Sequence, residues 1–255
     1  MNVMIAAARK AARGLIRDFG EVEQLQVSRK GPADFVSQAD LKAETVLLDE
    51  LSRARPGYGF VLEEKGVVEG PDKSHRWIID PLDGTTNFLH GIPHFAISIA
   101  LEREGQLTAG LVYNPVRDEL YRAEKGQGAH LNDRRIRVSA RADLTQCLVA
   151  TGIPFHGMDG HARFQQEMAR VMGAVSGIRR FGAAALDLAF VAAGRFDAFW
   201  ERGLKPWDIA AGIVLVREAG GEVSGLNDAD LLETGDIIAS NSHIHRPVQA
   251  LVTPR

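Results

Sequence analysis

The apolar residues of this chain follow a helical period in its first fifth. Residues 1–20 and 39–53 carry apolar side chains at helical spacing, with charged residues between them. In the second segment Ala43, Leu47 and Leu51 fall on one side of a helix. Both segments are therefore expected to be amphipathic helices that pack one face against a core.

The pattern changes to short apolar runs after Gly57. Residues 60–62 and 77–79 are expected to be short strands, with a polar loop at 65–75 between them. Further strands are expected at 95–101, 107–113, 119–124 and 128–131. Turn pairs such as Asn114-Pro115 and Lys125-Gly126 separate these runs, which predicts a meander of antiparallel strands.

The second half alternates between the two periods. Strands are expected at 147–151, 178–181, 198–200, 222–224 and 237–239. Helices are expected at 160–175, at 183–193, from 207 to about 219, and from about 245. Without a repeat or a separable linker, the pattern predicts one α+β domain over 1–255. Its subregions are an α+β part with the antiparallel sheet, roughly 1–140, and an α/β part, 141–255.

Composition narrows the class of protein. The 255 residues are 45% hydrophobic, enough for a sizeable core, and 30 basic and 33 acidic side chains leave a formal charge of −3. This near balance disfavours nucleic acid as a partner, and no apolar run approaches the length of a membrane span. The lone Cys147 cannot form an internal disulfide, and we expect it in a core strand of a cytoplasmic protein.

The segment 77–88 carries the most distinctive chemistry. It places Asp80 and Asp83 around Pro81, directly after an apolar run, and Gly84 follows. The two carboxylates suit Mg²⁺ or Mn²⁺, and the amides of Gly84 and Thr85 suit a phosphate. An ordinary Asp-Pro and Asp-Gly turn would explain the same residues. An aspartyl-phosphate phosphatase needs its two aspartates two residues apart, and the gap of three disfavours it.

Acidic residues stand at further points where the secondary structure changes. Glu63 ends a strand, and Asp208 and Asp40 each precede an apolar helix, where either could simply be an N-cap. With Glu63-Glu64, the segment 80–88 and the segment 207–212 in this order, the chain resembles the inositol monophosphatase family of lithium-sensitive, metal-dependent phosphatases along nearly its whole length. The resemblance implies a layered α-β-α-β-α sandwich.

The resemblance also implies a metal site. It assigns Glu63, Asp80 and the Leu82 carbonyl to one Mg²⁺. It assigns Asp80, Asp83 and Asp208 to a second, and a third ion would lie against Glu63. The catalytic residues would be Thr85, Asp40 and Glu63, with Thr85 and Asp40 orienting the attacking water. A two-metal clamp of this kind neutralises phosphate charge in an in-line displacement.

A separate set of residues is implied in substrate binding. It comprises Asp83, Gly84, Thr85, Arg179, Gly182, Ala183, Ala184, Glu201 and Asp208. Lys30 would belong to a lid over the site. Arg179 could instead form a surface ion pair or a subunit contact. One departure from the family pattern is Leu62, where a glycine often precedes the glutamate pair.

The expected function is hydrolysis of myo-inositol monophosphate, or a similar polyol or sugar phosphate, by metal-activated water in a dimeric enzyme. Three related phosphatase activities remain as alternatives, on fructose 1,6-bisphosphate, histidinol phosphate or phosphoadenosine phosphate. An interaction protein associated with RNA or transcription is the alternative from another class.

Overall fold

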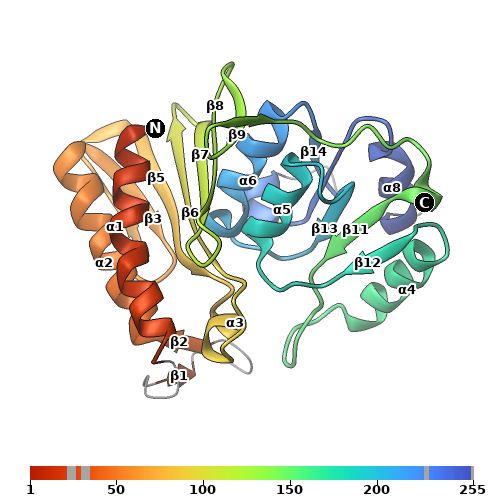
Figure 1. The fold of residues 1–255 in the computed structure, drawn as a ribbon, viewed down its shortest axis with the longest axis horizontal. Coiled ribbons are helices and arrows are strands. Elements are labelled where there is room, and N and C mark those ends of the chain that lie inside the picture. The colour runs from red at the N-terminus through yellow and green to blue at the C-terminus, as the bar shows by residue number, and fades with distance from the viewer. Residues whose placement is uncertain (22–26, 30–34, 227–229, 254–255) are drawn as a thin grey trace.

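The computed structural model describes residues 1–21, 27–29, 35–226 and 230–253, and it arranges them in alternating helical and sheet layers (Figure 1). The first layer consists of α1 (Asn2–Phe19) and α2 (Gln38–Ala54). The side chains of Met4, Ala8 and Leu15 on α1 are at most 1% exposed. Both helices therefore bury the apolar faces that their periodicity predicts.

The second layer is a sheet in the order β10-β9-β8-β7-β6-β5-β3-β4. Its strands are β3 (Tyr58–Leu62), β4 (Gly66–Val68), β5 (Asp72–Asp83), β6 (Ala96–Arg103), β7 (Gln106–Asn114), β8 (Glu119–Glu124), β9 (Gly128–Leu131) and β10 (Arg134–Ile136). From β5 to β10 each strand pairs antiparallel with the next, which confirms the predicted meander. Strand β3 pairs parallel with β5. The strands β1 (Val27–Arg29) and β2 (Phe35–Ser37) form a separate pair.

The central helical layer consists of α5 (Ala184–Ala192) and α6 (Pro206–Glu218) between the two sheets (Figure 1). Every residue of α5 is buried, because this helix has a sheet on each side. Small residues allow α6 to approach the first sheet closely. A Cβ on Gly110 of β7 would lie 2.5 Å from the Ala211 carbonyl oxygen of α6.

The second sheet has the order β12-β11-β13-β15-β14 and is mixed. Its strands are β11 (Leu148–Thr151), β12 (Gly177–Arg179), β13 (Ala198–Glu201), β14 (Glu222–Gly225) and β15 (Ile237–Ser240). The outer helices α4 (His161–Met172) and α8 (His245–Val252) cover its far face, with α3 (Thr85–Leu89) and α7 (Leu231–Thr234) as short connecting helices. The α-β-α-β-α layering is confirmed.

Two local predictions were wrong, and one alternative does not hold. The polar loop expected at 65–75 contains β4 and the start of β5, because their backbones pair with neighbouring strands. Cys147 precedes β11 instead of lying in it, and its buried thiol donates to the Asp143 carbonyl at 3.2 Å. The alternative role of Asp40 and Asp208 as N-caps does not hold, since α2 begins at Gln38 and α6 at Pro206.

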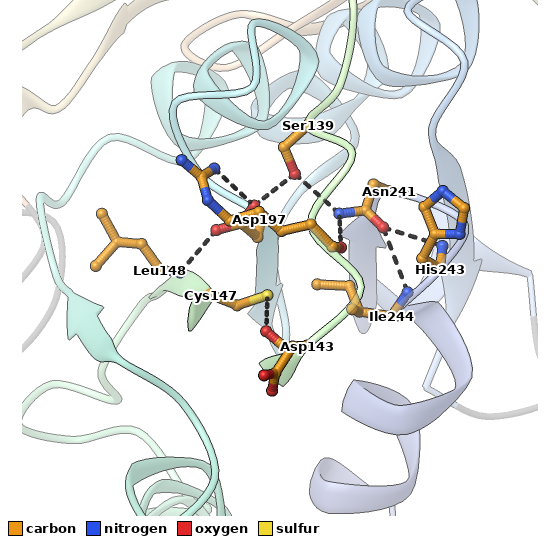
Figure 2. Close-up of polar contacts among 9 residues, drawn as sticks. Ser139, Asp143, Cys147, Leu148, Asp197, Asn241, His243 and Ile244 are labelled. Atoms are coloured by element: carbon orange, nitrogen blue, oxygen red, sulfur yellow. Dashed lines mark hydrogen bonds and ion pairs between the residues drawn. The ribbon is translucent and has the colours of Figure 1, made fainter. Parts of the chain in front are cut away.

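A buried polar cluster joins the segment that links the two halves to the second sheet (Figure 2). Asp197 is 1% exposed, and its carboxylate accepts hydrogen bonds from the Ser139 hydroxyl at 2.5 Å and the Leu148 amide at 2.7 Å. The side-chain amide of Asn241 also donates to Ser139, at 2.9 Å. These contacts tie residues before β11 to β13 and β15.

Among the described residues, no helix has the length and apolar character needed to cross a membrane.

Candidate active site

The central feature of the candidate site is a bulge near the end of β5. Asp80 pairs with Ser98 and Asp83 with Ala96, so three steps along β5 match two along β6. The prediction that the strand ends at Ile79 was therefore wrong, because pairing with β6 continues beyond Pro81. The bulge turns Asp80 inward, where its Oδ1 accepts the Leu82 amide at 2.8 Å.

Gly84 closes the bulge and leads into α3. Its φ of 90° lies in the left-handed region that glycine adopts without strain, and a Cβ there would lie 3.0 Å from the His94 carbonyl. The Thr85 hydroxyl donates to the Leu82 carbonyl oxygen at 2.9 Å. The implied pairing of Thr85 with Asp40 stays a prediction.

Asp83 links the first sheet to the central helices. It is 8% exposed, and its Oδ2 accepts the Ala185 amide of α5 at 2.9 Å. This places the carboxylate at a helix N-terminus, where free amides favour negative charge. Nearby, the side chain of Asn87 donates to the Phe181 carbonyl at 2.8 Å and the His94 carbonyl at 2.9 Å. The two halves of the site are therefore held together by direct hydrogen bonds.

Asp208 and the glutamate pair approach from two other elements. Asp208 lies in the first turn of α6, and its Oδ2 accepts the Lys205 amide at 2.7 Å. Glu63 and Glu64 lie in the turn from β3 to β4, and with Asp40 of α2 they offer ligand atoms within 4.8 Å of one another. The preceding Leu62 is fully buried in β3, so this position accepts leucine in place of glycine.

Burial and mutual repulsion mark these groups as one electrostatic cluster. Burial raises the pKa of Asp80 well above its ordinary value, and the negative charges of Glu63, Asp83, Asp208 and Asp40 add to the effect. Burial, followed by the charge of Asp208, raises the pKa of Asp83 to about 7. So many carboxylates are costly without a cation, and their oxygens are the ligands that hard divalent ions prefer. The residues present therefore fit a metal site.

A cavity of about 630 Å³ opens beside the cluster. The predicted site residues that line it are Glu63, Asp83, Gly182, Ala183, Ala184, Glu201 and Asp208. Its remaining wall includes aromatic side chains such as Trp200 and Phe164. Burial, followed by the charge of Asp208, raises the pKa of Glu201 to about 8.

Arg179, Gly84 and Thr85 do not line this cavity. Arg179 is exposed on β12 and donates to the Ile178 carbonyl at 3.0 Å, whereas its neighbour Arg180 lines the cavity. Lys30 lies outside the described residues. Sequence reasoning also missed Gly152, which lines the cavity where a Cβ would overlap the Glu201 carboxylate. No local pattern distinguishes this glycine from one in an ordinary turn.

Comparison with known proteins decides the family. Residues 1–253 match the sequence model of the inositol monophosphatase family. This chain belongs to the inositol monophosphatase family. It is therefore an enzyme of a phosphatase family, and this family is generally metal-dependent.

The inositol monophosphatase assignment agrees with individual relatives. The inositol-1-monophosphatase of Mesorhizobium japonicum is 60% identical over 247 residues, which cover 96% of this chain and 93% of that protein. The Nus factor SuhB of Pseudomonas aeruginosa is 43% identical over 259 residues, covering 100% of this chain and 96% of that protein. The crystal structure of the extragenic suppressor protein suhB from Bartonella henselae matches with a TM-score of 0.97 and 57% identity, over 100% of this chain and 98% of that one.

Proposed function

We propose that this protein hydrolyses myo-inositol monophosphate, or a similar polyol or sugar phosphate, to the free alcohol and inorganic phosphate with Mg²⁺ bound. The observation that carries the proposal is the buried carboxylate of Asp80, surrounded by the charges of Glu63, Asp83, Asp208 and Asp40 at one side of a cavity. A cluster of this composition is suited to divalent ions and, through them, to a phosphate dianion.

We assign the metal ligands as the resemblance to the family implies. Glu63, Asp80 and the Leu82 carbonyl would hold one ion, and Asp80, Asp83 and Asp208 a second. The group formed by Asp40, Glu63 and Glu64 supports a third. When bound, Mg²⁺ or Mn²⁺ would neutralise phosphate charge and lower the pKa of water.

The residues of the chain would orient the attacking water. The Thr85 proton is committed to the Leu82 carbonyl, so the lone pairs of its hydroxyl oxygen remain available to accept a hydrogen bond. We infer that this oxygen and Asp40 together aim the water at phosphorus. The reaction then needs no covalent phosphoenzyme.

The leaving alcohol would lie against Glu201, Asp83 and the segment 182–184. Carboxylates accept hydrogen bonds from hydroxyl groups, so a polyol fits this wall better than a lipid. Arg180 lines the same cavity and adds a cation that Arg179 does not supply. We also propose that the protein forms a dimer, is located in the cytoplasm and is inhibited by lithium. Sedimentation, cell fractionation and an assay with added lithium would check them.

Gly152→Ala is expected to raise KM for inositol monophosphate by about tenfold or more and to leave the fold intact. The new methyl group would displace the Glu201 carboxylate, the flexible end of a side chain, so a binding contact of about 1.4 kcal/mol or more is lost. Steady-state kinetics would measure this change.

Ethyl phosphate, which lacks further hydroxyl groups, should show little change in that variant. Gly14→Ala is the matched control, since a Cβ on Gly14 in α1 has no neighbour within 4 Å. An unchanged KM for inositol monophosphate would remove Glu201 from the substrate wall.

Stability of the metal-free protein should fall as the pH rises. The pKa values of Asp83, Glu201 and Asp208 are raised by burial to about 7, 8 and 6. The folded state thus binds protons more tightly than the unfolded one. The contribution of these carboxyls to folding stability is complete below about pH 4, where they are protonated in the unfolded state too. It is lost as the pH rises through their pKa values in the folded state.

Thermal unfolding in EDTA should therefore show a Tm lower by several degrees at pH 8.5 than at pH 5.5. Mg²⁺ binds the ionised carboxylates and releases their protons, so the rise in Tm on adding Mg²⁺ should grow over the same interval. A rise that is equal at both pH values would contradict carboxylate binding.

A panel of phosphate esters tests the function directly. Phosphate release would be measured from inositol monophosphate, fructose 1,6-bisphosphate, histidinol phosphate and phosphoadenosine phosphate, with Mg²⁺ present and after its removal. We expect Mg²⁺-dependent turnover with the highest kcat/KM on inositol monophosphate. Preference for another ester would keep the metal site and change only the leaving group.

A second candidate function is association with RNA or the transcription machinery. It is favoured by one observation, that relatives 42% to 45% identical are named Nus factor SuhB or putative Nus factor SuhB. The formal charge of −3 counts against a broad electrostatic surface for RNA. Titration with RNA at several salt concentrations would test it, because phosphate contacts make binding weaken steeply with salt.

A further inference from the structure

Glu44 is a completely buried carboxylate that does not line the cavity. It lies one helical turn after Asp40 in α2, so both side chains are on the same face of the helix. Its Oε2 accepts the backbone amide of Glu64 at 2.8 Å. A side chain of α2 is therefore bound to the turn that carries the glutamate pair.

The other carboxylate oxygen of Glu44, Oε1, has an incomplete set of partners in the described part of the chain. Among the described residues its Oε1 accepts no hydrogen bond, and its nearest cation is the Lys65 ammonium at 3.8 Å. Lys65 also donates to the Thr45 hydroxyl at 3.1 Å. A buried carboxylate with an incomplete set of partners is costly, and burial raises the pKa of Glu44.

Two side chains of α2 hold the turn from β3 to β4. Glu44 accepts the Glu64 amide and lies near the Lys65 ammonium, and the Thr45 hydroxyl accepts a hydrogen bond from Lys65. The same turn places the carboxylates of Glu63 and Glu64 within ligand distance of Asp40.

We propose that Glu44 is a positioning residue of the metal site, which fixes the β3–β4 turn through the Glu64 amide and so directs Glu63 toward Asp40 and Asp80. This inference rests on the proposed function, in which Glu63 is a metal ligand. Groups that hold metal ligands in the correct orientation preserve metal affinity without contacting the ion. Glu44 therefore acts on metal binding first and on turnover only through it.

The test measures Mg²⁺ affinity of the full chain by calorimetry and by the rise of Tm with Mg²⁺, independently of turnover. Glu44→Leu removes the acceptor and is expected to raise the Kd for Mg²⁺ by about tenfold or more. Glu44→Gln keeps a carbonyl oxygen for the Glu64 amide and should stay within about threefold of the wild type. Turnover of the leucine variant should recover at high Mg²⁺.

Glu50→Leu is the matched control in the same helix, where Glu50 pairs with Lys10 at 2.7 Å and Arg53 at 2.8 Å. Its Mg²⁺ affinity should equal that of the wild type. If Glu44→Leu does not fold, Glu44→Asp carries the same test, because it withdraws the carboxylate by one methylene.

The inference would be overturned if the variant that loses the acceptor bound Mg²⁺ with a Kd within about twofold of the wild-type value. It would also be overturned if Glu44→Gln weakened Mg²⁺ binding as much as Glu44→Leu does. In the first case Glu44 serves only the fold, and in the second its charge matters instead of its hydrogen bond. A wild-type protein that binds no Mg²⁺ would overturn the proposed function itself.

Discussion

Asp80→Asn is expected to lower turnover by at least about a thousandfold and to leave the metal-free protein as stable as the wild type or more stable. The loss follows from the position of Asp80, whose carboxylate would be shared by both ions. The retained stability follows from two facts. Asparagine keeps the oxygen that accepts the Leu82 amide, and the substitution removes one buried charge that Glu63, Asp83 and Asp208 repel.

Phosphate release, Mg²⁺ binding and thermal unfolding would be measured on the same preparation. Asp72→Asn is the matched control, because Asp72 lies at the opposite end of β5, where its carboxylate accepts the Ser74 amide at 2.9 Å. That variant should keep both activity and Mg²⁺ affinity. Turnover above about a tenth of the wild-type value in Asp80→Asn would refute the shared-ligand role.

Asp197→Ala is expected to destabilise the protein by about 3–5 kcal/mol, the usual cost of breaking a buried, hydrogen-bonded charge pair. Its carboxylate accepts the Ser139 hydroxyl, the Leu148 amide and the Arg141 guanidinium, the last at 3.1 Å. Figure 2 shows Asp197 between Ser139 and the start of β11. Without it, the buried Leu148 amide loses its acceptor and the linking segment loses its attachment to β13.

Urea unfolding and thermal unfolding would measure this change, with Tm falling by roughly 2–4 °C for each kcal/mol. Asp143→Ala is the control, since Asp143 is an exposed N-cap whose removal costs about 1 kcal/mol. The active site lies elsewhere, so Asp197→Ala should keep normal kcat well below its Tm. A change below about 1 kcal/mol would show that the cluster in Figure 2 does not hold the linking segment to the second sheet.

Local periodicity was sufficient for most elements of the fold. The amphipathic pattern of residues 1–20 became α1, and the runs between 95 and 131 became β6 to β9. The failures occurred where pairing overrode local signals. Pro81 is a local strand breaker, yet β5 continues to Asp83 because β6 supplies partners on both sides of the bulge.

Motif spacing selected several acidic residues that the structure brings together. Asp80, Asp83 and Asp208 were chosen by motif, and the structure gathers their charges in one cluster. Gly152 and Glu44 were not selected, because the role proposed for each depends on a contact with a distant segment, namely Glu201 and the Glu64 amide. Arg179 was chosen because it matches a position in the family pattern, whereas Arg180 is the arginine that lines the cavity. A motif does not specify which of two adjacent side chains faces a cavity.

The sequence by itself determined the local elements, the α+β class and the identity of the acidic motif, because these depend on side chains a few residues apart. Only the tertiary structure decided which carboxylates share one environment. Asp40, Glu63, Asp80 and Asp208 come from α2, the β3–β4 turn, β5 and α6, and their separation is set by how the layers pack. Packing brings like charges together in a buried place at a cost in free energy, and a bound cation would offset that cost.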